Sequence, residues 1–153
     1  MLIVWRDQMS VDGGVIDDDH RTLIAIINEF SAADVTPVVI PVLASILRKL
    51  DHYTKTHFER EETLQRAANY PFHDAHKQAH KDLMRQLSTV REELRLKADA
   101  KKLEDIPAMH AKMAEFLHHW LIDHILDTDL RMKPYTKAMR AHASKLGARL
   151  TAE

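Results

Sequence analysis

The sequence predicts an all-α fold, namely an antiparallel up-down four-helix bundle with an N-terminal arm and a short C-terminal helix. Three observations support this prediction. The composition favours helix, with three glycines and five prolines in 153 residues and an abundance of Ala, Leu, Lys, Glu, Arg and Met. Apolar residues recur at helical spacing in four long segments. Short connections separate these segments, as expected for antiparallel neighbours.

The first two helices are expected at residues 17–33 and 37–68. The first carries His20 on its apolar stripe, between Ile16 and Leu23. Pro37 and Pro41 fit the opening of the second helix, where a missing N–H costs little. The stripe of the second helix is expected to contain Val39, Leu43, Ile46, Leu50, Tyr53, His57, Glu61 and Leu64.

The third and fourth helices are expected at residues 72–97 and 107–131, joined by a polar connection at 97–105. The sequence Asn69-Tyr70-Pro71 separates the second helix from the third. Pro134 is expected to end the fourth helix, and a basic segment at 135–150 forms a fifth. No repeat or second domain is found, so we expect one domain over 1–153, with the bundle at 17–131 and a C-terminal extension at 134–153.

Composition excludes several classes of function. The chain has no cysteine, which rules out disulfides, thiolate metal sites and a cysteine nucleophile. The formal net charge of −1 gives no indication of a nucleic-acid partner or of an anionic membrane surface. The first residues lack a basic signal-peptide region, and no apolar stretch approaches the roughly 20 residues that span a bilayer. We therefore expect a soluble cytoplasmic protein with no membrane or nucleic-acid partner.

Eleven histidines are an excess for this length, and their positions matter more than their number. Residues four apart on a helix share a face, so the spacing places His57 with Glu61 and His76 with His80. His124 and Asp129 are five apart, which places them on adjoining faces. With His20, these pairs distribute the polar residues over all four predicted helices.

Taken singly, each of these motifs is weak. A pair of histidines four apart is usually an ordinary surface or core pair, and His57 with Glu61 fits an exposed hydrogen-bonded pair. Together they interrupt the apolar stripes of four helices, and several unpartnered buried His, Glu and Asp would unfold an ordinary domain. A shared metal ion would give all of these buried groups a partner at once. A set of imidazole and carboxylate ligands suits iron, zinc or manganese. Five imidazoles and two carboxylates are too many for a single zinc ion.

These motifs resemble the hemerythrin family, specifically the bacterial hemerythrins. The first matching pieces are Ile16-Asp17 leading to His20, and His57-Phe58 followed by Glu61-Glu62. Tyr70-Pro71 leading to His76 and His80 also match, as do Trp120-Leu121 followed by His124-Ile125 and Asp129. The resemblance covers roughly residues 5–135.

The resemblance implies two non-haem iron ions joined by an oxo or hydroxo bridge. Glu61 and Asp129 would bridge the two ions, and His20 with His57 would hold the iron that keeps an open position. The other iron would be held by His76, His80 and His124. The family's oxygen pocket is lined by apolar residues, which match Phe58, Trp120, Leu121 and Ile125.

Some residues depart from the family pattern or lie outside it. Asp19 stands where the family usually has glutamine, and we expect this change to face the surface. Glu62 is interpreted as solvated or as a neighbour of the ligands. The segment after Asp129 is longer than in compact members, and it either covers a bundle end or contacts a partner. The remaining histidines are expected at the surface, namely His52, His73, His110, His118, His119 and His142. For His73, His118 and His119 the alternative is a position next to the ligand residues.

The leading functional hypothesis is reversible binding of dioxygen for storage, transport or sensing, without catalysis. One alternative is a di-iron enzyme acting on peroxide or nitric oxide, although oxygen-activating di-iron bundles use mainly glutamate and Glu-x-x-His spacing. Another is an interaction module that responds to iron or oxygen through the C-terminal helix. The sequence does not identify a protein recipient of the oxygen.

Overall fold

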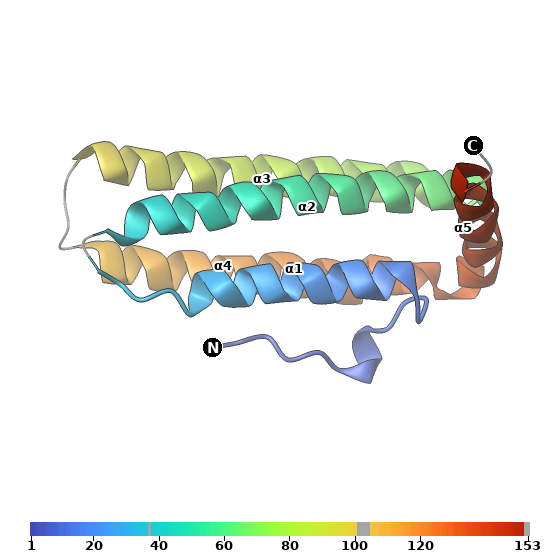
Figure 1. The fold of residues 1–153 in the computed structure, drawn as a ribbon, viewed down its shortest axis with the longest axis horizontal. Coiled ribbons are helices and arrows are strands. Elements are labelled where there is room, and N and C mark those ends of the chain that lie inside the picture. Colours follow the sequence, from blue (N-terminus) through green and yellow to red (C-terminus); the bar gives the residue numbers. More distant parts are fainter. Residues whose placement is uncertain (37, 101–104, 152–153) are drawn as a thin grey trace.

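The computed structural model describes residues 1–36, 38–100 and 105–151, and over these residues the chain forms helices and no strand (Figure 1). The all-α prediction is therefore confirmed. The helices over residues 15–31, 39–67, 73–100 and 106–127 lie antiparallel in a bundle, and the helix over 136–151 lies crosswise at one end of it (Figure 1). In chain order the elements are η1 (Asp7–Met9), α1 (Val15–Ser31), α2 (Val39–Ala67), α3 (His73–Ala100), α4 (Ile106–Asp127), η3 (Asp129–Tyr135) and α5 (Thr136–Thr151).

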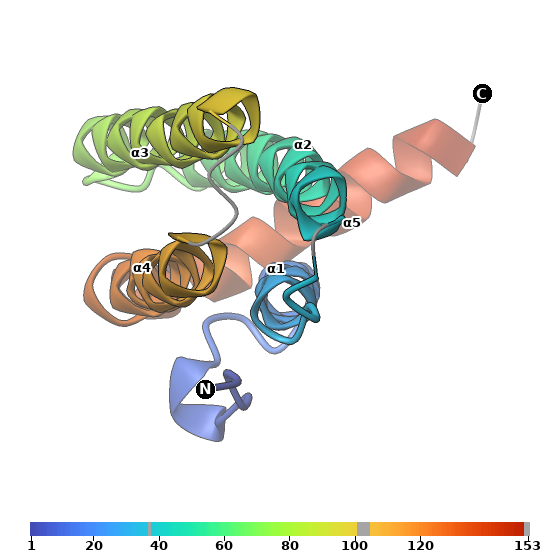
Figure 2. The same ribbon diagram turned by 90° about the vertical axis from the view of Figure 1, so that its left-hand side faces the viewer.

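The four long helices occupy the corners of a bundle, with α1 beside α2 and α4, and α2 beside α3 (Figure 2). Because successive helices are antiparallel, the starts of α1 and α3 and the ends of α2 and α4 share one end of the bundle (Figure 1). The histidines singled out in the sequence lie at these helix ends. The up-down topology thus brings them to one level.

Helix α1 begins at Val15, earlier than the predicted 17, because Asp12 caps its first turn. The Asp12 carboxylate accepts hydrogen bonds from the backbone N–H groups of Gly14, Ile16 and Asp17, at 2.8, 3.1 and 3.1 Å. These N–H groups have no partner within the helix, so a carboxylate stabilises them. The predicted start of the second helix at Pro37 lies outside the described residues, and α2 begins at Val39.

The predictions for the later helices need two corrections. Helix α3 continues to Ala100, beyond the predicted end at 97. Helix α4 ends at Asp127, before the predicted 131, because Thr128 leaves helical geometry at φ −118° and ψ −57°. The chain then tightens into the 3-10 helix η3, which contains Pro134. The fifth helix, α5, starts at Thr136, close to its predicted position.

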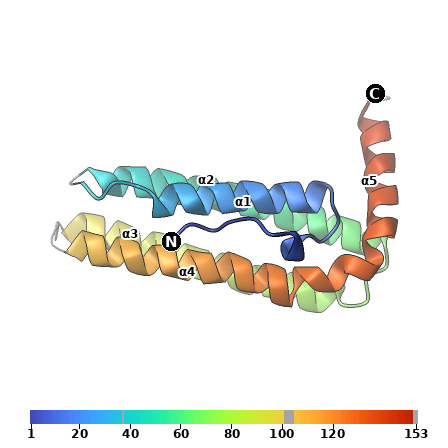
Figure 3. The same cartoon turned by 90° about the horizontal axis from the view of Figure 1, so that it is seen from below.

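Two apolar cores fill the molecule. The larger core lies between the four long helices, and a smaller one lies at the end where α5 crosses the bundle (Figure 3). Arg140 on α5 also donates a hydrogen bond to the backbone carbonyl of Asp12, at 3.0 Å. The C-terminal extension therefore covers a bundle end, which is one of the two expectations for it. The smaller core contains Val11, Ile16, Leu64, Tyr70, Met132 and Met139.

The N-terminal arm runs along α1 and α4 (Figures 1 and 3). The Asn28 side chain accepts a hydrogen bond from the N–H of Ile3 and donates one to its carbonyl, both at 2.8 Å. The Arg21 guanidinium lies 4.3 Å from the centre of the Trp5 ring, a cation–π contact. These contacts fix the arm on the bundle. Among the described residues, no helix combines the length and apolar character that crossing a membrane requires.

The stripe of α2 differs from the prediction at one position. Tyr53 is 45% exposed, whereas the neighbouring Thr54 is completely buried. Phe72, expected at the start of the third helix, is also exposed and precedes α3. A polar threonine therefore occupies a core position that the sequence was expected to fill with tyrosine.

Candidate metal centre

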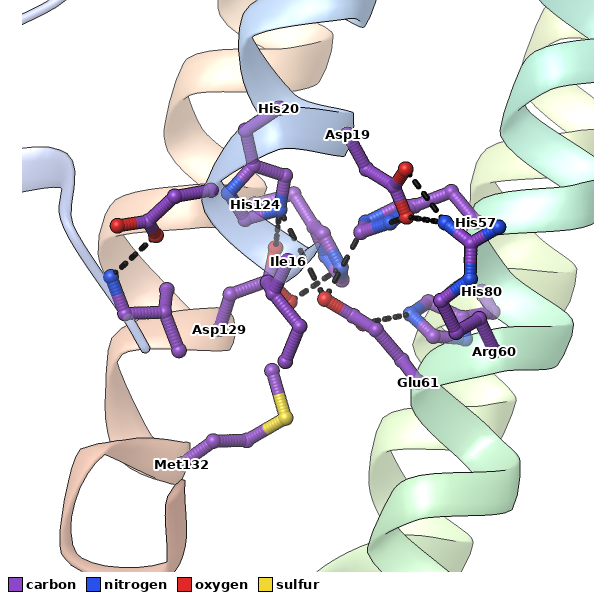
Figure 4. Close-up of polar contacts among 12 residues, drawn as sticks. Ile16, Asp19, His20, His57, Arg60, Glu61, His80, His124, Asp129 and Met132 are labelled. Carbon is purple, nitrogen blue, oxygen red and sulfur yellow. Dashed lines mark hydrogen bonds and ion pairs between the residues drawn. The ribbon is translucent and has the colours of Figure 1, made fainter. Parts of the chain in front are cut away.

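The polar residues predicted from the helix stripes converge in one buried cluster near the α5 end of the bundle (Figure 4). Each of the four long helices contributes at least one of them, and η3 contributes Asp129. All are buried, with no more than 8% of any residue exposed. The cluster consists of His20, His57, Glu61, His76, His80, His124 and Asp129.

One half of the cluster contains two imidazoles. His20 Nε2 lies 3.0 Å from Asp129 Oδ2 and 3.7 Å from Glu61 Oε1. His57 Nε2 lies 3.2 Å from the same Glu61 oxygen, Oε1. Two nitrogens and two carboxylate oxygens thus surround one point.

The other half contains three imidazoles. Glu61 Oε2 lies 3.1 Å from His76 Nε2 and 3.2 Å from His80 Nε2. Asp129 Oδ1 lies 3.1 Å from His76 Nε2 and 2.9 Å from His124 Nε2. Each carboxylate therefore directs one oxygen to the two-imidazole half and its other oxygen to the three-imidazole half.

This arrangement fits two cations bridged by two carboxylates. Adjacent donors around an octahedral ion at about 2.1 Å lie about 3.0 Å apart, close to the nitrogen–oxygen distances found here. Several of the inward-facing atoms also lack a hydrogen-bond partner among the described residues, although burying such atoms is costly. The unpartnered inward-facing atoms are His20 Nε2, His57 Nε2, Glu61 Oε1, His80 Nε2, His124 Nε2, Asp129 Oδ1 and Asp129 Oδ2, and the Nδ1 atoms of His20 and His76 also lack a partner.

The pKa values in the cluster show how it balances charge. Burial alone would lower the pKa of His57, but the Glu61 carboxylate and the hydrogen bond to Asp19 raise it to about 10. Burial likewise lowers the pKa of His76, but Asp129 and Glu61 outweigh burial and raise it to about 9. Burial raises the pKa of Glu61, as does Asp129, yet His57 and His76 hold it well below its usual range. The cluster thus stabilises buried carboxylates with positive charge, a role suited to bound cations.

Asp129 reaches the cluster because α4 ends early. In a continuous helix, a residue five positions after His124 would point to an adjoining face. The distortion at Thr128 and the tighter η3 turn redirect the Asp129 side chain, which is completely buried. The pKa of Asp129 is raised by burial but held well below its usual range by His124, His20 and His76.

Two carboxylates outside the cluster orient its imidazoles, and for Asp19 this corrects the expectation of a surface-facing residue. The Nδ1 atom of His57 lies 3.1 Å from Asp19 Oδ2, and Arg60 also binds Asp19. His80 Nδ1 lies 3.0 Å from Glu62 Oε1. Burial raises the pKa of Asp19, but His57 and Arg60 lower it overall, which keeps the carboxylate ionised. Each half of the cluster therefore has one imidazole whose Nε2 is aimed inward by a carboxylate on Nδ1.

Of the apolar residues predicted to line an oxygen pocket, Phe58 contacts the cluster directly. The Phe58 ring stacks on the His80 imidazole, with ring centres 3.7 Å apart and planes within 6°. Trp120 donates a hydrogen bond from its indole N–H to the Leu83 carbonyl, at 3.1 Å. All four of these residues are buried, namely Phe58, Trp120, Leu121 and Ile125.

The remaining histidines lie outside the cluster, and one of them contradicts the expectation of a surface position. His110 is buried, and its Nε2 donates a 2.7 Å hydrogen bond to the Phe30 carbonyl. His73 is half-buried and contacts Gln65 Oε1 at 3.1 Å. His52 and His119 are exposed as expected. A single histidine on an amphipathic helix does not reveal a carbonyl partner on another helix, so the sequence contained no signal for His110.

Asp17 has a structural role that the sequence did not reveal. Its buried carboxylate accepts hydrogen bonds from the Ser10 hydroxyl and from the N–H groups of Val11 and Gly13, at 2.6, 2.7 and 3.0 Å. Burial raises the pKa of Asp17, but these hydrogen bonds outweigh burial and lower it overall. The residue therefore fixes the turn that leads into α1, three residues before His20.

Comparison with known proteins places this chain in a family. The model of the hemerythrin HHE cation binding domain matches residues 14–136. The chain is 31% identical over 144 residues to a bacteriohemerythrin of Stenotrophomonas maltophilia, covering 94% of this chain and 86% of that protein. A bacteriohemerythrin of Pseudomonas aeruginosa gives the same identity and coverage. Myohemerythrin-1 of Phascolopsis gouldii is 29% identical over 131 residues, covering 85% of this chain and 91% of the relative. The chain belongs to the hemerythrin family.

Proposed function

We propose that this protein binds dioxygen reversibly at a non-haem di-iron centre. In this proposal Glu61 and Asp129 would be shared by the two irons, and His20 with His57 would complete the protein ligands of one. The observation that carries the proposal is the division of five imidazoles into unequal halves around two shared carboxylates. The other iron would be held by His76, His80 and His124.

The unequal division implies one free coordination position. Two octahedral ions sharing two carboxylates and one bridging oxygen need six further ligands, and the cluster supplies five imidazoles. With two irons bound, the free position would fall to the half that contains His20 and His57. When bound, the two ferrous ions supply the electrons with which dioxygen is held.

The surroundings of the cluster support a carrier. Phe58, Trp120, Leu121 and Ile125 are buried apolar side chains, and excluding water protects a bound ligand from protonation and release in reduced form. The carboxylates that contact the imidazoles from outside, Asp19 and Glu62, bind Nδ1 atoms rather than facing the inward Nε2 atoms. They therefore orient ligands and are not placed to transfer protons to a substrate.

Anaerobic loading with ferrous iron tests this function. We expect two irons per chain and a colourless protein that develops a visible absorption band in air and loses it under vacuum, over repeated cycles. His57→Ala should abolish the cycle, whereas His52→Ala, which changes an exposed histidine on the same helix, should preserve it. Irreversible oxidation without a coloured form, or steady turnover of peroxide or nitric oxide, would contradict the carrier proposal.

We also propose that the chain is one domain acting in the cytoplasm in oxygen storage, delivery or sensing. The packing of α5 against the bundle end supports a single domain, because Met139 is part of the smaller core. The near-zero net charge supports the expectation of no nucleic-acid partner. The visible spectrum of whole cells expressing the chain, before and after oxygen removal, tests whether the cycle operates there.

A further inference from the structure

Thr54 is a completely buried residue whose hydroxyl has no hydrogen-bond partner among the described residues. An unsatisfied buried polar group costs about 1–3 kcal/mol, so such a residue is expected to have a compensating role. It lies on α2, in the core position that the sequence was expected to fill with tyrosine.

Five other hydroxyls in the long helices have a backbone partner. Each donates a hydrogen bond to the carbonyl of the residue four positions earlier, at 2.8–3.2 Å. This local bond is a common arrangement for serine and threonine within helices. The Thr54 hydroxyl does not make it. The residues that do are Thr22, Ser31, Thr56, Thr63 and Thr89.

The register of the helices places Thr54 one turn from His57, next to the buried cluster. It precedes His57 by three residues, and therefore lies on the same face of α2, about 4.5 Å along the helix axis. In this antiparallel bundle the corresponding positions on the other helices are three residues after His20, three after His80 and three before His124. These positions are occupied by Leu23, Leu83 and Leu121. Thr54 is the polar member of an otherwise leucine layer.

The two sides of the cluster differ in which half they offer a hydroxyl. Toward α5, the cluster is closed by Ile16 and Met132, both completely buried and seen beside it in Figure 4. Tyr70 also lies on this side, and its buried hydroxyl has no partner among the described residues, but its ring lies beside His76 of the three-imidazole half, with ring centres 6.2 Å apart. Toward the middle of the bundle lies the layer of leucines with Thr54. A hydroxyl donor on this second side suits a small ligand that carries negative charge, such as an anion or reduced oxygen.

We propose that the Thr54 hydroxyl donates a hydrogen bond to the small ligand that the centre takes up. The proposal rests on the proposed function, because His57, one turn away on the same helix, belongs to the half with the free position. Thr54 then acts as a positioning residue whose hydroxyl is unsatisfied only while the ligand is absent. Its contribution is expected to strengthen ligand binding while weakening the metal-free fold.

Azide binding to the oxidised, iron-loaded protein tests this proposal, because azide is a small anion and needs no reversible oxygenation. Thr54→Val keeps the shape of the side chain but removes the donor, and we expect azide affinity to fall about tenfold. Thr54→Ser keeps the hydroxyl and should stay near the original affinity. The matched control is Thr56→Val on the same helix, where the exposed hydroxyl bonds to the His52 carbonyl.

A second measurement is the thermal unfolding of the metal-free protein. If the hydroxyl has no protein partner, Thr54→Val leaves the unfolding temperature unchanged or raises it, because an orphaned polar group is replaced by an apolar one. Unchanged azide affinity in Thr54→Val would overturn the proposal. Failure of this variant to fold or to hold iron would overturn it too, because the hydroxyl would then have a structural partner. If the original protein held two irons and bound azide but not dioxygen, the proposed function would fail while the role of Thr54 stood.

Discussion

The Asp19–His57 contact gives the sharpest test of how the centre is built. Asp19→Ala removes the carboxylate that lies 3.1 Å from His57 Nδ1, within a site where the His57 side chain is 2% exposed. Loss of such a partner typically weakens metal binding by about 10–100-fold, or about 1.4–2.7 kcal/mol. Arg60 is 39% exposed and regains water when Asp19 is removed, so the freed guanidinium adds little to this loss.

The weakening should be confined to the half of the cluster that contains His57. In a chelator titration, we expect Asp19→Ala to lose one metal per chain at a lower chelator concentration than the original protein, and to retain the other. Glu62→Ala should weaken the opposite half through His80. The control is Asp18→Ala, which alters an exposed neighbour paired with Arg21. Equal affinity of Asp19→Ala and the original protein for both metals would refute the reasoning.

Three further predictions concern the ligands, the fold and the pocket. Glu61→Gln should reduce the metal content from two ions to at most one per chain, measured by elemental analysis, because a neutral amide cannot bridge two cations as a carboxylate does. Asp17→Asn should destabilise the protein at pH 7 by about 2–3 kcal/mol in denaturant unfolding. Because the folded pKa of Asp17 is lowered, its stabilisation is complete above its ordinary pKa and is lost as pH falls through the folded value, so the difference should shrink in acid. Phe58→Ala should lower the free energy of unfolding by about 3–5 kcal/mol. It should also accelerate air oxidation of the ferrous protein, with the rate measured by visible absorption.

The fold and the meeting of the polar side chains in one buried cluster could be predicted because they rest on local periodicity. His57 with Glu61 and His76 with His80 occupy stripe positions that would otherwise be apolar, and such local conflicts are typical of functional sites. Helix ends were harder, because they depend on caps such as the Asp12 carboxylate, which bonds to three N–H groups at once. The early end of α4 at Asp127 had no clear signal in the sequence.

Contacts between helices were the part that the sequence did not reveal. Asp19 was expected at the surface because its own helix gives no sign of Arg60 and His57, which lie about forty positions away. Tyr53 and Thr54 are adjacent on α2, and the helical period alone did not decide which of them enters the core. The buried Thr54 is the less hydrophobic of the two. Tertiary packing overrode residue preference at this position.

The residues around the ligands explain why the segments outside the four long helices matter for the site. Asp17 binds the backbone of the N-terminal arm, and Asp12 caps α1 while its carbonyl accepts a hydrogen bond from Arg140 on α5. The arm, the start of α1 and α5 are therefore tied together within a few residues of His20. Because Ile16 belongs to the smaller core and His20 lies one turn later on α1, the packing of α5 also fixes the height of His20. The C-terminal extension thus closes the end of the bundle and holds one half of the cluster in register with the other.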